Sequence, residues 1–159
     1  MTGPVIWLTW IDDCLIAGNE DGVKAAKEQM KQRFDCDDVG ALTEYVGCRV
    51  DRNKNSIKID KPVLLQSFED EFGCTDNNVK ILAESGSVLV QNEQDSLSEG
   101  EQFKYSSGVG KLLHMMQWSR QESYNAVCEL SSGTSPAHIK AMKQVMEYWL
   151  STKEIGLVL

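Results

Sequence analysis

The sequence has no apolar run of eighteen residues, so it predicts no membrane-spanning helix. No basic region precedes the short apolar stretch near the N-terminus, and we expect that stretch to form a strand, not a signal peptide. The five cysteines show no Cys-x-x-Cys spacing, and an odd number argues against a closed disulfide framework. These absences indicate an intracellular protein, cytoplasmic or nuclear, with no membrane partner.

Histidine and positive charge are also scarce. His114 and His138 lie far apart in the sequence and away from any cysteine pair, so we expect no zinc site. The 16 basic residues face 24 acidic ones, which gives a net charge of −8 and no general basic field for nucleic-acid phosphates. Local lysine clusters within residues 24–31, 54–61 and 140–143 are either solvated surface or phosphate contacts.

The hydrophobic content of 42% in 159 residues is enough for one core and a small second one. Two hairpins are expected. The first runs through the apolar segments around residues 5–18, and the second pairs residues 42–50 with residues 56–59. A polar stretch with little apolar content predicts a long loop near residues 74–100. The sequence therefore favours an α+β fold.

Helix signals separate the hairpins and fill the second half of the chain. Asn19 can cap a helix, and Pro62 can open another that ends at Gly73. Capping-box spacing predicts helix starts at Ser98 and Ser119. A further helix is expected just after residue 135, where a serine precedes a proline.

An acidic pair, Asp12-Asp13, lies between two apolar segments that are each long enough to form a buried strand. At the bend of a hairpin, two adjacent carboxylates can converge on one site, whereas on a regular strand they point to opposite faces. A divalent cation with a preference for oxygen ligands would offset their desolvation and repulsion. The alternative is ordinary turn chemistry, since aspartate favours turns.

Four motifs in the same order resemble copia-type LTR retrotransposon reverse transcriptases. Residues 10–13 (Trp-Ile-Asp-Asp) are similar to the catalytic hairpin of that family, and residues 38–50 to its Asp-Leu-Gly and Phe-Leu-Gly segments. Residues 105–113 resemble its Tyr-Arg-x-x-Val-Gly-x-Leu helix. Residues 136–138 and 148–153 resemble its closing helix.

The resemblance implies a partial polymerase palm followed by a helical thumb. Residues 1–60 would form the palm part, with antiparallel hairpins and a helix, and residues 61–154 the thumb-like part. Residues 155–159 would begin the connection to an absent ribonuclease H domain. The implied partners are an RNA or DNA template with its primer and a deoxynucleoside triphosphate, together with the missing finger, palm and ribonuclease H segments of the same polyprotein.

The implied activity is RNA-directed DNA polymerisation by two-metal nucleotidyl transfer with Mg²⁺, or with Mn²⁺. By resemblance, Asp12 and Asp13 are the catalytic metal ligands, and Trp10 and Ile11 pack against the primer end. A second set of primer contacts would come from residues 47–49, which match the primer grip: Gly47, Cys48 and Arg49. An ordinary edge hairpin is the alternative for this set.

The sequence departs from the family pattern at three points. No aspartate upstream of Asp12 can supply the third metal ligand, Trp10 stands where tyrosine is usual, and residues 120–122 read Arg-Gln-Glu where Arg-Pro-Asp is typical. The first departure predicts a fragment that is inactive alone, and the last suggests sequence drift. A non-enzymatic remnant or interaction module therefore remains an alternative, as does an unrelated calcium- or magnesium-binding domain.

Overall fold

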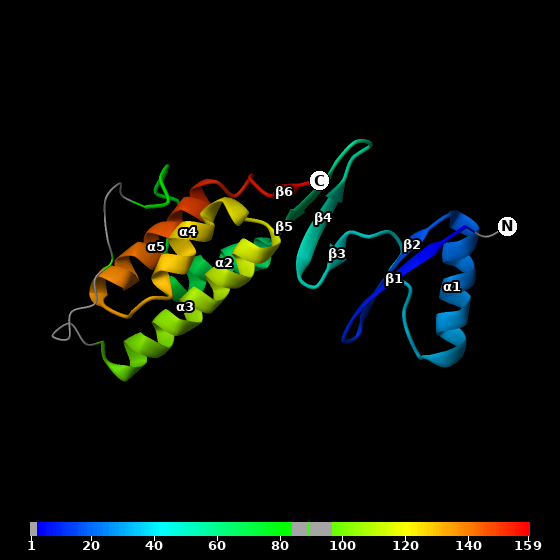
Figure 1. Ribbon diagram of the computed structural model, residues 1–159, viewed down its shortest axis with the longest axis horizontal. Coiled ribbons are helices and arrows are strands. Elements are labelled where there is room, and N and C mark those ends of the chain that lie inside the picture. The colour runs from blue at the N-terminus through cyan, green and yellow to red at the C-terminus, as the bar shows by residue number, and fades with distance from the viewer. Residues whose placement is uncertain (1–2, 84–88, 90–96) are drawn as a thin grey trace. The chain divides into compact units, whose positions relative to one another are not determined.

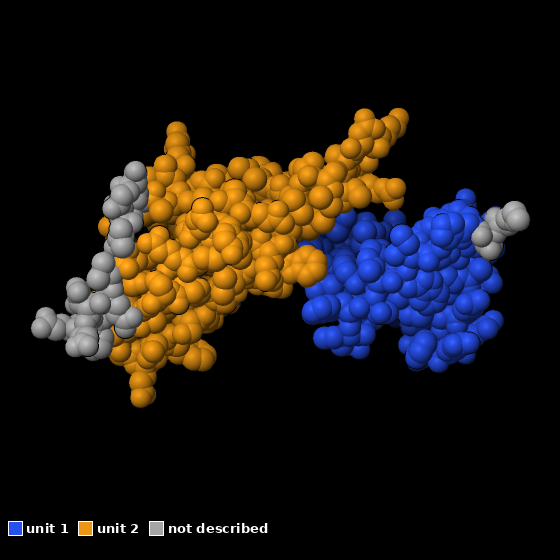
Figure 2. All heavy atoms as spheres, in the orientation of Figure 1, with its two compact units in different colours: residues 1–50 blue, residues 51–159 orange. Residues whose placement is uncertain are grey.

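The computed structural model describes residues 3–83, 89 and 97–159, and it confirms the predicted α+β class. The chain divides into two compact units, Met1–Val50 and Asp51–Leu159, which Figure 2 shows in different colours. Each unit is described by itself below. The loop predicted near residues 74–100 lies partly outside the described residues, while residues 74–83 contain no helix or strand.

The first unit contains an antiparallel hairpin and one helix (Figure 1). Strand β1 (Val5–Trp10) pairs with β2 (Asp13–Gly18), and α1 (Glu20–Arg33) follows and packs on both strands. The predicted cap at Asn19 is confirmed, because its side chain accepts a hydrogen bond of 2.7 Å from the backbone N–H of Gly22. This cap fixes where the chain leaves the hairpin and turns into the helix.

Four short strands form a second sheet in the order β3-β4-β5-β6. They are β3 (Glu44–Tyr45), β4 (Cys48–Arg52), β5 (Ile57–Asp60) and β6 (Leu157–Val158), and the division between the two units falls within β4. The predicted second hairpin is confirmed in part, because β4 and β5 are neighbours in the sheet but residues 42–50 do not form one strand. Its loop is shorter than expected, because β4 continues to residue 52.

Besides β5 and β6, the second unit holds a cluster of helices (Figure 1). They are α2 (Pro62–Phe72), α3 (Glu99–Trp118), the 3-10 helix η1 (Gln121–Ser123), α4 (Tyr124–Leu130) and α5 (Pro136–Ser151). Their buried side chains form one hydrophobic core, whose largest members include Phe68, Leu112, Leu130, Met146 and Trp149. Among the described residues, no helix combines the length and hydrophobicity that crossing a membrane requires.

Most of the predicted helix ends of this unit are confirmed. Pro62 is the first residue of α2, and Gly73 ends it in the left-handed conformation with φ of 64°. Ser98 and Glu101 form the predicted capping box at the start of α3. The hydroxyl of Ser135 accepts from the backbone N–H of His138 and so caps α5.

The capping box predicted at Ser119 is wrong. Ser119 is the C-terminal cap of α3, and its hydroxyl donates back to the carbonyl of Met115. The chain then continues through η1, whose N-terminus has no side-chain cap. Glu122 does not cap a helix; its carboxylate accepts a hydrogen bond from the side chain of Arg120.

Arg120 is fully buried in the second unit, with 0% of its surface exposed. Its guanidinium donates to the Glu122 carboxylate at 2.6 Å, and to the hydroxyl and the carbonyl of Thr152 at 2.7 and 3.3 Å. The rings of Tyr148 and Trp149 lie 5.5 and 5.7 Å from the guanidinium carbon. Arg120 and Glu122 thus form a partly buried polar network with Thr152 at the end of α5.

Tyr105 gives a test of this core that depends on pH. Its buried hydroxyl donates to the carbonyl of Leu130, and burial raises the pKa of Tyr105 to about 12. Because the folded-state pKa exceeds the ordinary value near 10, the contribution of the neutral phenol to stability is complete below pH 10 and is lost as the pH rises through 12.

We expect Tyr105→Phe to lower the free energy of unfolding by about 1–2 kcal/mol at neutral pH, because the Leu130 carbonyl loses a buried donor. Absorbance titration of phenolate checks the assignment, since the variant should lack the step near pH 12. A step near pH 12 that persists in the variant would contradict it.

Candidate functional site

The acidic pair lies at the tip of the β1–β2 hairpin (Figure 1). Trp10, the last residue of β1, lies opposite Asp13, the first residue of β2, so Ile11 and Asp12 alone form the turn. Two-residue connections are the tightest common hairpin turns. The structure therefore brings four of the predicted site residues, residues 10–13, together at one tip.

The backbone of the turn is strained at Ile11. This residue has φ of 51°, in the left-handed region that a β-branched side chain rarely adopts, and 87% of it is exposed. Two-residue hairpin turns have positive φ at their first central residue, so the tight connection between β1 and β2 holds Ile11 in this conformation. Strained residues of this kind cluster at functional sites, where the surrounding structure holds them.

Neither carboxylate is desolvated. Asp12 and Asp13 are both exposed, and β1, which the sequence predicted to be a buried strand, exposes 63% of Ile6 and 52% of Leu8. An exposed acidic pair needs no compensating cation for stability. Among the described residues, no group of three His, Cys, Asp or Glu side chains is placed to hold a metal ion.

The predicted primer-grip residues lie at a different turn. Tyr45 pairs with Cys48, and between them Val46 and Gly47 have φ of 50° and 67°. Positive φ at both central residues is the signature of a type I′ hairpin turn. The single strand predicted over residues 42–50 is therefore wrong, because Gly47 ends a tight turn between β3 and β4.

The side chains after this turn differ in exposure. Cys48 is only 1% exposed, and its thiol is therefore not available to contact a nucleic acid in this state. Arg49 is exposed on β4, and Gly47 is exposed at the turn. The structure thus leaves Arg49 as the accessible cation of the predicted set.

Not all lysines of the three clusters lie free at the solvated surface; some form ion pairs and one is buried. Lys27 pairs with Asp38 at 2.8 Å, and Lys58 lies 3.6 Å from Asp60. Lys61 is 2% exposed, and its ammonium lies 5.4 Å from the centroid of the Trp118 ring. Lys61 therefore packs inside the fold against an aromatic ring. The spacing of the lysines in the sequence did not predict this burial.

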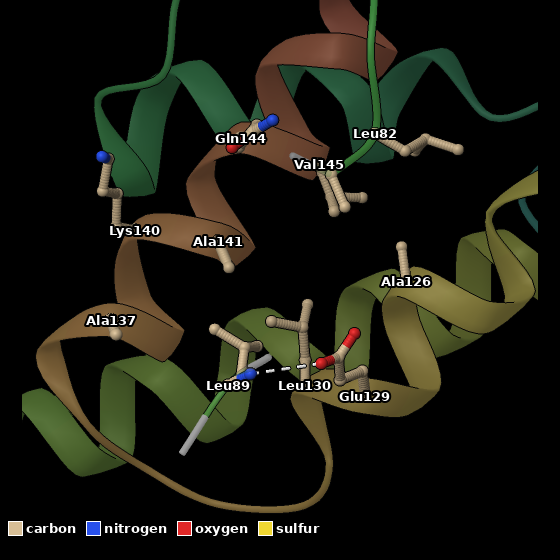
Figure 3. A pocket seen from close by; sticks show the side chains of 11 residues that line it. Leu82, Leu89, Ala126, Glu129, Leu130, Ala137, Lys140, Ala141, Gln144 and Val145 are labelled. Atoms are coloured by element: carbon tan, nitrogen blue, oxygen red, sulfur yellow. Dashed lines mark hydrogen bonds between the residues drawn. The ribbon is translucent and has the colours of Figure 1, made fainter. Parts of the chain in front are cut away.

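A cavity of about 230 Å³ lies in the second unit, far in sequence from the predicted site (Figure 3). Its lining is mostly small or apolar and comes from α4, α5, the segment before residue 84 and residue 89: Leu82, Ala83, Leu89, Ala126, Glu129, Leu130, Ala137, Lys140, Ala141, Gln144 and Val145. Glu129 accepts a hydrogen bond of 3.3 Å from the backbone of Leu89 across this cavity. None of the predicted site residues lines it, and no motif in the sequence marked it.

A curated relative covers most of the chain. The retrovirus-related Pol polyprotein from transposon TNT 1-94 of Nicotiana tabacum is 23% identical over 159 positions, which cover 93% of this chain. The chain spans 12% of the length of that polyprotein. No family model and no solved structure matches the chain. The similarity supports a retrotransposon origin.

Proposed function

We propose that this chain is the palm-and-thumb part of a retrotransposon reverse transcriptase and that the tip of the β1–β2 hairpin is its metal-binding element. The proposal rests chiefly on one observation: Asp12 lies in a strained two-residue turn and Asp13 directly follows it. The similarity to a transposon Pol polyprotein along 93% of the chain supports the same function. With the chain spanning 12% of that polyprotein, we expect no polymerase activity from the chain alone.

The residues at the tip suit a hard divalent ion. Mg²⁺ binds through one or two carboxylates and completes its coordination with water and substrate phosphates, so Asp12 and Asp13 would hold it without further protein ligands. When bound, the ion supplies Lewis-acid stabilisation of charge on phosphoryl oxygens.

Neighbouring side chains would position the nucleic acid. Trp10 is 56% exposed and Ile11 87% exposed at the same tip, so both are accessible to a primer end. Arg49 is exposed on β4 and would contact a phosphate of the primer strand. Cys48, being buried, would act only by holding the turn before it.

Binding of Mn²⁺, a paramagnetic substitute for Mg²⁺, tests the proposed site. We expect saturable broadening of backbone NMR signals centred on the β1–β2 tip, and at least a tenfold weaker affinity in Asp12→Asn, because one of two charged ligands is lost. Asp21→Asn is the matched control: it removes one carboxylate from another adjacent acidic pair, Glu20-Asp21, in the first turn of α1.

Two results would count against the metal site. One is broadening that does not saturate at the tip, and the other is an equal loss of affinity in the control variant.

Primer–template binding then tests the wider proposal. We expect an affinity that falls steeply with salt and weakens in Arg49→Gln, because phosphate contacts release counterions.

The second candidate function is a non-enzymatic retroelement remnant or interaction module. Its support is the exposure of both carboxylates and the lack of a third ligand among the residues that the structure describes. Under this candidate, the Mn²⁺ titration gives only weak, unlocalised broadening, and primer–template binding is absent.

A further inference from the structure

The two faces of the β1–β2 hairpin differ in how well they are covered. The strand register places Val5, Trp7 and Thr9 on one face and Ile6, Leu8 and Trp10 on the other. Helix α1 packs on the Val5 end of the first face, since a Cβ added at Gly22 would lie 2.7 Å from the Val5 side chain, while Trp7 on the same face is 41% exposed.

The other face, formed by Ile6, Leu8 and Trp10 with Leu15 and Ala17 of β2, is called the open face below. On this face Ile6, Leu8 and Trp10 are 63%, 52% and 56% exposed. Among the described residues the hairpin forms a sheet of only two strands. A contiguous apolar surface of this kind marks an interaction site.

We propose that the open face docks against the open face of a second copy of this chain, as a symmetric two-layer sandwich. The proposal does not depend on metal binding or on polymerase function, but the dimer would cover Trp10 and Asp13, so dimerisation and primer binding at the tip would exclude each other.

The area of the open face is sufficient for a weak dimer. From their exposure, Ile6, Leu8 and Trp10 together with the partly exposed Leu15 and the exposed Ala17 offer on the order of 500 Å² of apolar surface per chain. Two copies would bury about 1,000 Å² in total, which is the lower end for a specific interface. Trp10 provides an aromatic anchor of the type that dominates binding energy at such interfaces.

The distribution of charge favours an antiparallel arrangement of the two copies. Within β1 and β2 the open face carries a single charged residue, Asp13, at one end. A twofold axis through the middle of the face, near Leu8, would place the Asp13 of each copy at the Ile6 end of its partner. The two carboxylates then lie at opposite ends of the interface and do not repel each other at short range.

Salt should strengthen this association. Each chain carries a net charge of −8, so two copies repel each other over long distances, and added salt screens that repulsion. Binding to a nucleic acid has the opposite dependence, because it weakens with salt. The sign of the salt effect therefore separates a second copy of the chain from a nucleic acid as the partner.

Sedimentation equilibrium of the full chain between roughly 1 μM and 1 mM tests the proposal, since small interfaces give dissociation constants in that range. We expect a monomer–dimer equilibrium that strengthens with salt, and at least a tenfold larger dissociation constant in Leu8→Lys. Thr9→Lys is the matched control, because it adds the same charge to an exposed residue of β1 on the other face. It should dimerise like the parent chain.

Hydrogen exchange of the β1 and β2 amides must show that each variant keeps the hairpin, and Ile6→Lys serves as a second open-face variant if Leu8→Lys loses it. A parent chain that stays monomeric throughout the concentration range would overturn the proposal. So would an equal loss of dimer in Thr9→Lys, or dimers that persist unchanged in both open-face variants.

Discussion

Replacing Arg120 with alanine is expected to lower the free energy of unfolding by about 3–4 kcal/mol, measured by urea denaturation. The loss has two sources. The hydroxyl and the carbonyl of Thr152 lose their guanidinium donors, and the rings of Tyr148 and Trp149 lose the side chain that lies against them. Because Arg120 is 0% exposed, the space that it leaves is a cavity inside the core.

Two further variants separate these sources. Arg120→Met keeps most of the apolar stem and removes the donors, so it should recover part of the loss. Glu122→Gln keeps an acceptor for Arg120 on a side chain that is 40% exposed, and should cost less than about 1 kcal/mol. If Arg120→Ala costs no more than Glu122→Gln, the buried network does not stabilise the second unit.

Two glycines in the middle of α3, Gly108 and Gly110, are expected to respond to alanine with opposite signs. A Cβ at Gly108 would collide with the sulfur of Met142 and lie 2.9 Å from Cε1 of Phe72, whereas a Cβ at Gly110 would meet nothing within 4 Å. Gly108→Ala should therefore destabilise the protein by about 1–3 kcal/mol through overpacking. Gly110→Ala should stabilise it by roughly 0.5–1 kcal/mol, because alanine is the better helix former.

Each glycine variant is the control for the other, since both make the same change two residues apart in one helix. Thermal unfolding followed by circular dichroism measures the difference. A stabilising change in both variants would show that α2 and α5 do not approach α3 closely at Gly108. Of these two glycines, only Gly108 lies close to another helix.

The hairpin tip shows where local sequence signals succeed. An acidic pair between two apolar segments predicts a turn, and the structure has a two-residue turn that includes Asp12. Burial of β1 was predicted from the same segment and is wrong, since Leu8 is 52% exposed. Apolar residues in a strand indicate that another surface packs against it, but they do not identify the segment or chain that provides this surface.

The turn at Val46-Gly47 shows where such signals fail. A glycine inside an apolar stretch is compatible with a bulge, a bend or a turn, and a β-branched residue with positive φ is not expected from propensity. Only the pairing of Tyr45 with Cys48 identifies a type I′ turn. The position of Arg49, directly after that turn on β4, follows from this pairing.

The sequence by itself determined the α+β class, the Asn19, Ser98 and Ser135 caps, and the ends of α2. The caps and helix ends depend on contacts between residues within four positions of one another, and the class follows from local patterns of apolar and helix-capping residues. Tertiary structure alone decided the burial of Arg120 and Lys61, the contrast between Gly108 and Gly110, and the open face of the hairpin. Each of these depends on which distant side chains surround a residue, and a residue's own neighbours in the sequence carry no information about that.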